Sequence, residues 1–301
     1  MNKLLHVNLN KSSDKNKNFS STPYLNLKCK SLNLHKPVVM GVLNLSKDSF
    51  FEGNYNINII GLINQTKKML DEGAKIIDIG AVSTRPKAKL ISEEKELSRL
   101  MEVLPELIRS FPKAIFSIDT FRANIAEKVI EAGAAMINDI SGGTLDDKMF
   151  GTISSLQVPY ILMHIQGTPQ NMQYDPKYEN VVLEIEQFFL KQINKLEKLG
   201  FFQIILDPGF GFGKTLEQNY QILKNLKTFS KLGFPVLAGI SRKSMINKVL
   251  GTSPNTALNG TTILNTIAVL NGAKILRVHD VKEAVEVIRL CEHLSGGETK
   301  R

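Results

Sequence analysis

One pattern recurs along the chain: a helical stretch, a glycine, a short apolar run and then a polar residue. Its five copies run over residues 73–78, 133–138, 200–207, 233–241 and 272–277. A glycine that follows a helix adopts the left-handed cap conformation that other residues resist. An apolar run of about four to six residues is typical of a strand buried on both faces, as in a parallel sheet. Similar runs at 38–43, 115–118 and 159–163 bring the set of predicted strands to eight.

The segments between these strands carry helical periodicity. In 179–199, apolar residues fall on one stripe and charged residues fall opposite, and 216–229 and 281–294 are patterned in the same way. Eight strand–helix units in about 265 residues predict a single-domain (β/α)8 barrel. The alternative is an open doubly wound sheet, which binds its ligand at one switch point and needs chemistry at only a few strand ends.

Nearly every predicted strand ends in a polar residue. In chain order these are Asn44, Asp78, Asp119, Asn138 with Asp139, His164, Asp207, Ser241 with Arg242 and Lys243, and Arg277 with His279 and Asp280. In a barrel these ends converge on one face, where the active site lies. The number of polar ends therefore favours the barrel over the open sheet.

The strand-end residues divide into two chemical groups. Asp119, Asn138 and Asp207 are acceptors, which suit a buried heterocycle with several N–H groups, because an unpaired buried donor costs about 1–3 kcal/mol. The second group consists of cations. These are Lys243, Arg277 and His279 on the last two strands, where barrels often bind phosphate. The two groups together predict a nitrogen-rich ring beside an anionic group.

Two familiar motifs are nearly matched but excluded. Residues 209–215 look like a phosphate loop, but Pro208 occupies the position where that motif requires its first glycine. We therefore expect Lys214 to matter less for activity than Lys243. No Gly-x-Ser-x-Gly segment occurs, and neither Cys29 nor Cys291 follows a strand at the predicted site. This favours transfer between two bound substrates without a covalent enzyme intermediate.

Charge and composition narrow the possible binding partners and the cellular location of the protein. The net charge is +9, but residues 1–36 alone hold seven lysines and one acidic residue, so the rest of the chain is ordinarily balanced. We expect no nucleic-acid or membrane partner, because the barrel is not strongly basic and no apolar run reaches the length of a membrane helix. Residues 1–22 are expected to be a basic, disordered leader, 23–295 the barrel and 296–301 a polar tail. Two cysteines and no signal peptide predict a cytoplasmic protein.

The strand-end motifs resemble, in order, those of the dihydropteroate synthase family, the targets of sulfonamide drugs. The matching segments lie at 40–44 with 48–50, 77–80 with 83–86, 117–120, 137–143, 162–164 with 167–169, 207–209 with 211–215, 241–244 and 277–280. Each segment alone is weak, but the ordered set is specific. The resemblance implies a TIM barrel and a homodimer. It also implies a transferase that joins (7,8-dihydropterin-6-yl)methyl diphosphate to p-aminobenzoate, releasing diphosphate.

The resemblance also assigns roles to residues. It implies that the pterin ring binds to Asp119, Asn138, Asp207 and Lys243. It implies that diphosphate binds to Asn44, Arg85, Arg277 and His279, with Mg²⁺ as cofactor on Asn44. It implies that p-aminobenzoate lies near Thr84, Pro86, Phe212, Lys243 and Ser244, and that the catalytic residues are Asp119, Lys243 and Arg85.

The chain departs from the family pattern in two loops, at Lys47, Val82 and Lys87, where the family more often has other residues. Two alternatives remain at this point. One is a pterin-binding module for methyl transfer, which would share the acceptors but would not need the motifs at 83–86 and 241–244. The other is a paralogue without activity, which the altered loops allow.

Overall fold

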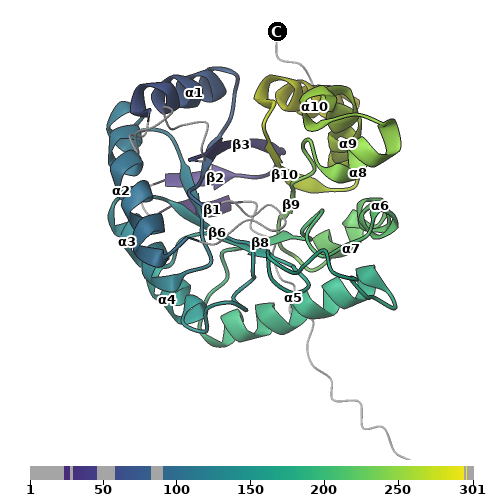
Figure 1. The fold of residues 1–301 in the computed structure, drawn as a ribbon, viewed down its shortest axis with the longest axis horizontal. Coiled ribbons are helices and arrows are strands. Elements are labelled where there is room, and N and C mark those ends of the chain that lie inside the picture. The colour runs from purple at the N-terminus through teal and green to yellow at the C-terminus, as the bar shows by residue number, and fades with distance from the viewer. Residues whose placement is uncertain (1–23, 28–29, 46–57, 83–90, 295, 297–301) are drawn as a thin grey trace, which may run out of the picture.

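The fold is a closed barrel of eight parallel strands inside a ring of helices, in a computed structural model that describes residues 24–27, 30–45, 58–82, 91–294 and 296. In Figure 1 the ring runs from α1 through α5 to α10 and encloses the strands. The strands are hydrogen-bonded in the order β10-β3-β4-β5-β6-β7-β8-β9, so each strand lies beside its neighbours in sequence and the last pairs with the first. The predicted barrel is confirmed and the open sheet is excluded.

The strands of the barrel lie where the apolar runs predict them. Their bounds are β3 Val38–Asn44, β4 Ile76–Gly80, β5 Phe116–Asp119, β6 Met136–Asp139, β7 Tyr160–Met163, β8 Ile204–Asp207, β9 Val236–Ala238 and β10 Ala273–Val278. Most of their residues are buried, because helices cover the outside and side chains fill the inside. β9 ends at Ala238, so Ser241 and Lys243 lie in the loop after it rather than on the strand.

The helices begin and end at residues that suit a helix terminus. Their bounds are α1 Ile59–Asp71, α2 Glu93–Ser110, α3 Ala123–Glu131, α4 Met149–Leu156, α5 Val181–Lys198, α6 Leu216–Lys224, α7 Leu226–Ser230, α8 Ser244–Leu250, α9 Leu258–Leu270 and α10 Val281–Leu294, with a short 3-10 helix η2 at Pro254–Thr256. The side chains of Ser92 and Asn180 accept from the first turns of α2 and α5, and Thr215 forms a capping box with Gln218 at α6.

The single helix predicted over 216–229 is wrong in one respect, because it is divided into α6 and α7 at Asn225. Asn225 leaves helical geometry at φ −106° and ψ 18°, and its side-chain amide donates to the carbonyl of Gln221. Asparagine competes for backbone hydrogen bonds in this way, which weakens a helix interior.

A hairpin that the sequence pattern did not predict covers one end of the barrel. Strands β1 (Tyr24–Leu27) and β2 (Lys30–Asn33) pair antiparallel, and leucines from this segment pack against the apolar side chains inside the barrel. The ammonium of Lys30 donates to the carbonyls of Lys113 and Ala114, just before β5. The hairpin thus covers the amino-terminal end of the barrel. A functional site is expected at the carboxyl-terminal end.

Across the ranges that the structure describes, no helix has both the length and the apolar character that crossing a membrane would require.

Candidate active site

The polar residues at the strand ends form one layer inside the barrel. An apolar layer lies directly next to it, toward the amino-terminal ends of the strands. Met136 and Ile205 belong to the apolar cluster inside the barrel. Asn138 and Asp207 stand two residues further along the same strands, and Arg277 holds the equivalent place on β10. Because side chains alternate between the two faces of a strand, these residues also face inward. They lie at the carboxyl ends of the strands, where barrel enzymes carry their sites.

Strand register brings three of the predicted residues together around Gly80. Asn44 pairs with Gly80, Gly80 with Asp119, and Asp119 with Asn138, across β3 to β6. A Cβ atom on Gly80 would lie 3.5 Å from Oδ1 of Asn44 and 3.8 Å from Oδ2 of Asp119. These two oxygens therefore converge over a position that has no side chain, which leaves room for a bound group.

Arg277 joins two carboxylates in this layer. Its Nε donates to Oδ2 of Asp78 at 2.7 Å and its Nη2 donates to Oδ2 of Asp119 at 3.2 Å. The same Oδ2 of Asp78 accepts from Nδ2 of Asn138 at 3.0 Å. Asp78 is fully buried and connects the acceptor group to the cation group, although the sequence reasoning noted it only as a strand end and gave it no role.

The carboxyl group of Asp119 has a pKa close to neutral pH. Burial raises the pKa of its carboxyl group to about 7, and the negative charges of Asp78 and Glu96 add to that rise. The guanidinium of Arg277 opposes the rise by favouring the ionised form. A carboxyl group poised in this way responds strongly to a positive charge that a ligand brings to the site.

Asp207 and Lys243 influence each other electrostatically across the site. Oδ1 of Asp207 accepts from the backbone N–H of Gly209 at 2.7 Å, and burial raises the pKa of this carboxyl group while Lys243 opposes that rise. The ammonium of Lys243 donates to the carbonyl of Phe210 and lies 4.7 Å from the ring centre of Phe212. Burial lowers the pKa of Lys243 to about 8, with the charge of Asp207 acting against the change.

His279 is presented to the site by Ser241. The hydroxyl oxygen of Ser241 accepts from the backbone N–H of His279 at 3.2 Å and lies 3.0 Å from its Nδ1. With its oxygen already accepting, the hydroxyl is best placed to donate its proton to Nδ1, which leaves the imidazole proton on Nε2. Burial and the charge of Arg277 lower the pKa of His279 to about 4, so the ring is a neutral donor. Sequence reasoning missed this role of Ser241.

Comparison with known proteins decides the family. The family described as "Pterin binding enzyme" matches residues 40–279. "Dihydropteroate synthase" of Escherichia coli (strain K12) is 41% identical over 278 residues, which cover 90% of this chain and 96% of that protein. The chain belongs to the dihydropteroate synthase family. The resemblance drawn from the strand-end motifs is confirmed, and members of this family are transferases.

Solved dihydropteroate synthases have the same fold. The Yersinia pestis enzyme, solved as a sulfonamide drug complex, superposes with a TM-score of 0.85 at 38% identity and covers 91% of this chain and 99% of that one. The Xanthomonas albilineans enzyme with 4-aminobenzoic acid gives 0.84 at 34% identity, covering 91% of this chain and 98% of its own. Its complex with 7,8-dihydropteroate gives 0.81 at 32% identity, covering 91% and 99%.

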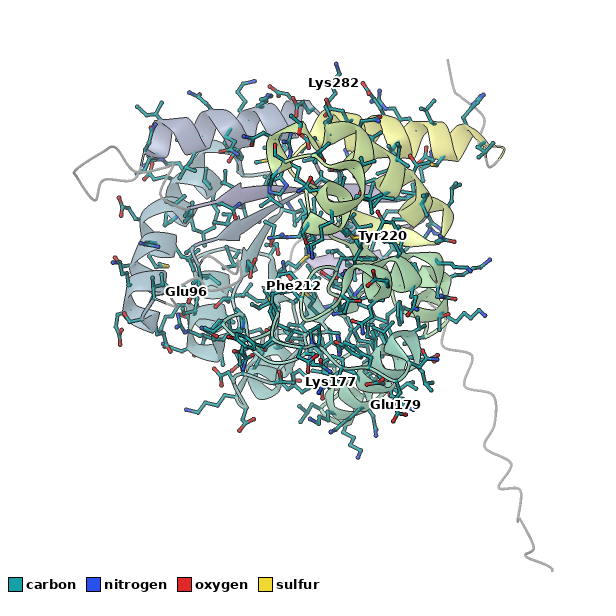
Figure 2. The ribbon with its side chains drawn as sticks, turned by 45° about the vertical axis from the view of Figure 1, so that its right-hand side comes forward. Glu96, Lys177, Glu179, Phe212, Tyr220 and Lys282 are labelled. Atoms are coloured by element: carbon teal, nitrogen blue, oxygen red, sulfur yellow. The ribbon has the colours of Figure 1, made fainter. Side chains whose placement is uncertain are left out.

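Among the residues that the resemblance to dihydropteroate synthases assigns to p-aminobenzoate, the structure describes Phe212, Lys243 and Ser244. Phe212 packs on a small apolar cluster near the barrel mouth, made of Phe121, Ile140, Met163, Ile165 and Met172. Figure 2 shows Phe212 near the middle of the view, inside the ring of helices. Ser244 is the exposed first residue of α8, directly after Lys243. Thr84, Arg85, Pro86, Lys47 and Lys87 lie outside the described residues.

Two polar strand ends that were expected to converge on this site do not face it. Asp139 turns into its own loop, where its carboxylate accepts from Ser141, Gly143 and the hydroxyl of Tyr160. The ring of His164 packs against Phe188, with ring centres 4.9 Å apart, and burial lowers its pKa to about 2. Successive side chains point to opposite faces of a strand. A residue that follows an inward-facing residue therefore points away from the barrel interior.

Arg242 and Asp280 form a brace beside the site rather than part of it. Nε and Nη2 of Arg242 donate to the two oxygens of Asp280 at 2.9 and 2.6 Å. Arg242 sits at φ +58°, a left-handed conformation that costs a non-glycine residue energy. The bidentate pair holds that conformation and ties the loop before α8 to the start of α10.

Lys214 has a structural role that the sequence pattern did not predict. Its buried ammonium donates to the carbonyls of His164, Gly209 and Phe212 at 3.2, 3.0 and 2.8 Å. Burial lowers the pKa of Lys214 well below its ordinary value. Lys214 therefore joins the loops after β7 and β8, and one of its three acceptors is Phe212 itself. It is unsuitable as a neutral control for Lys243.

Proposed function

We propose that the chain joins (7,8-dihydropterin-6-yl)methyl diphosphate to p-aminobenzoate, giving 7,8-dihydropteroate and diphosphate, with the ring bound in the polar layer of the barrel. One observation carries this proposal. The acceptors Asp119, Asn138 and Asp207 lie in the same interior layer as Arg277, which continues the layer toward His279. A ring with several N–H groups matches the acceptors, and its diphosphate matches the cations.

Four residues bind the pterin in this proposal. Asp119, Asn138 and Asp207 accept from its N–H groups, and the ammonium of Lys243 donates to its carbonyl. The opposed pKa shifts of Asp119, to about 7, and Lys243, to about 8, support the assignment, because a ligand that satisfies both relieves the cost of burying them. The Xanthomonas albilineans relative was solved with 7,8-dihydropteroate, which carries the same ring.

Arg277, His279 and Asn44 bind the diphosphate in this proposal, together with Arg85. Arg277 is a preorganised cation, since two carboxylates fix its guanidinium, and His279 adds a neutral N–H donor. As the bond to diphosphate breaks, these groups stabilise the charge that develops on the leaving oxygen. Asp119 stabilises the positive charge that develops on the ring.

The donors near Asn44 fit Mg²⁺. Oδ1 of Asn44 and Oδ2 of Asp119 converge over Gly80, and hard oxygen donors are the ligands that this ion prefers. The described part of the chain contains no cluster of three or more His, Cys, Asp and Glu residues suited to a metal. We therefore assign the ion to Asn44 and the diphosphate oxygens. When bound, it would neutralise charge on the leaving group.

p-Aminobenzoate lies in this proposal near Phe212, Lys243 and Ser244, together with Thr84 and Pro86. The ring of Phe212 offers an apolar face, and Lys243 lies beside it as a cation for the carboxylate. The amine then attacks the methylene carbon and loses its proton to solvent, so the new C–N bond replaces the bond to diphosphate. The Xanthomonas albilineans relative was also solved with 4-aminobenzoic acid.

The experiment that tests the proposal is diphosphate release measured with each component omitted in turn. Release is expected only when the dihydropterin diphosphate, p-aminobenzoate and Mg²⁺ are all present, with one diphosphate released for each dihydropteroate formed. Release that proceeds without p-aminobenzoate would identify a hydrolase and contradict the proposal.

We propose further that the protein is a cytoplasmic homodimer that meets its copy through α9. No charged residue occurs in Leu258–Leu270, and Ile263, Ile267 and Leu270 of this helix are exposed. An exposed apolar face without charged residues is a surface through which two copies can associate. Sedimentation should show a dimer for the parent protein and a monomer for Ile267→Asp. A parent protein that sediments as a monomer would contradict this assembly.

A further inference from the structure

Asp78 is a buried charge to which nothing above assigns a function. It lies on β4 with no exposed surface. A single oxygen, Oδ2, accepts from Nδ2 of Asn138 at 3.0 Å and from Nε of Arg277 at 2.7 Å. The other oxygen, Oδ1, is buried and has no hydrogen-bond partner among the described residues. Both hydrogen bonds of this carboxylate are thus accepted by one atom, Oδ2.

The contact between Asp78 and Asn138 determines which way the amide of Asn138 points. Oδ2 of Asp78 accepts from Arg277 and acts as an acceptor toward Asn138 as well, so the amide turns its NH2 group toward Asp78. Its carbonyl oxygen, Oδ1, then points away from Asp78, and no residue in the described ranges donates to it. If the amide were reversed, two acceptors would face each other and the site would offer a donor instead.

The same oxygen also fixes Arg277. The guanidinium is held at Nε by Asp78 and at Nη2 by Asp119, which leaves it little freedom to rotate. Asp78 therefore contacts one residue assigned to the ring and one assigned to the diphosphate, although it is too deeply buried to touch either ligand.

We propose that Asp78 is a positioning residue that sets the hydrogen-bond polarity of the ring site, by holding Asn138 as an acceptor while it orients Arg277 toward the anion. This inference rests on the proposed function, because it takes Asn138 as a partner of the ring. The competing explanation is that Asp78 only balances the charge of Arg277. The two explanations differ in whether the accepting oxygen or the negative charge is what the site needs.

Asparagine at position 78 separates the two explanations. In Asp78→Asn, the amide oxygen can keep the place of Oδ2 and accept from Asn138 and Arg277, while its NH2 group takes the place of the unpartnered Oδ1. The acceptor is kept and the charge is lost. Asp78→Leu removes both with little change in volume. Ser117→Ala is the matched control, since Ser117 pairs with Asp78 across β4 and β5, is fully buried, and has a hydroxyl without a partner in the described ranges.

The experiment measures the affinity of the full chain for two probes by calorimetry. One is 6-hydroxymethylpterin, which has the ring without the diphosphate, and the other is inorganic diphosphate with Mg²⁺. We expect Asp78→Asn to bind the ring probe within about threefold of the parent and diphosphate about tenfold more weakly. Asp78→Leu should bind the ring probe at least about thirtyfold more weakly. Ser117→Ala should bind both probes as the parent does.

Each result has a definite meaning. If Asp78→Asn loses ring affinity as strongly as it loses diphosphate affinity, the charge is what matters and the inference is overturned, even if Asp78→Leu does not fold. Ring affinity that is unchanged in a folded Asp78→Leu variant also overturns it. If the parent protein binds neither probe, the proposed function itself fails, and that outcome is distinct from the other two.

Discussion

Two layers of inward-facing residues on the same strands of the barrel differ in polarity although they are alike in burial and backbone geometry. In the lower layer, Met136 and Ile205 pack with other apolar side chains and are fully buried. In the upper layer, two residues further along, Asn138 and Asp207 are nearly as buried but polar. The backbone geometry is the same in both, so the strands determine where a side chain points and the sequence alone determines what it does there.

The two layers also contribute to stability with opposite signs. Burial of the lower layer is the ordinary driving force of folding. In and beside the upper layer, burial raises the pKa of Asp119 and lowers that of Lys243, which means that the charged form of each group costs free energy before ligand binds. This cost is the usual sign of a site that is built for a ligand rather than for the fold.

The largest loss of stability is expected when a polar residue, like those of the upper layer, replaces an apolar residue of the lower layer. Ile205→Asn puts an amide without partners into the apolar interior, where it both leaves a cavity and buries unpaired polar atoms. The free energy of unfolding should fall by about 4 kcal/mol or more, measured by urea denaturation. Ile205→Val is the control, with an expected loss of about 0.5–1.5 kcal/mol. Equal losses for both variants would contradict the distinction between the layers.

Removing a site residue beside the upper layer, in the loop after β9, should reduce activity and leave the fold intact. Lys243→Ala is expected to lower kcat/KM at least about a hundredfold, equivalent to about 2.7 kcal/mol of transition-state stabilisation, because the ring and p-aminobenzoate lose a shared cation. Lys248→Ala is the matched control, since Lys248 lies on α8, the helix that directly follows Lys243, and is exposed. Lys243→Ala with nearly full activity would show that the site is assigned wrongly.

Lys214 should give an intermediate and mainly structural effect. Lys214→Met keeps the aliphatic chain but leaves the carbonyls of His164, Gly209 and Phe212 without their donor. We expect a loss of about 1–3 kcal/mol in the free energy of unfolding. The loss in kcat/KM should be smaller than that of Lys243→Ala, because Phe212 is displaced but not removed. A variant as stable as the parent would mean that these three hydrogen bonds do not brace the loops.

The barrel and its strand ends could be predicted from the sequence because both depend on short-range patterns. An apolar run followed by a polar residue recurs along the chain, in five copies after a glycine, and Asp119, Asn138, Asp207 and Arg277 each close such a run. Register could not be predicted in the same way. That Asn44 and Asp119 converge over Gly80 depends on which residues pair across β3, β4 and β5.

The errors lie where one local pattern allows several structures. Asp139 follows Asn138 directly, and only the direction of the strand decides which of the two faces inward. Lys214 belongs to a loop that resembles a phosphate loop, and its role became clear only when the loop after β7 was placed beside it. The hairpin β1–β2 was missed because its strands contain no continuous apolar run and their partner surface, the amino-terminal end of the barrel, is distant in sequence.

Asp119→Asn tests most directly the claim that the upper layer sacrifices stability for function. Because burial raises the pKa of Asp119 to about 7, this carboxyl group favours folding at low pH, and that contribution is lost as the pH rises through about 7. At pH 8 without ligand, the variant has no charge to bury, so its Tm should be a few degrees above that of the parent, with no such advantage at pH 4. Its kcat should fall at least about a hundredfold, by more than its affinity for the pterin falls. A Tm at pH 8 that falls together with kcat, or a kcat that does not change, would contradict the account.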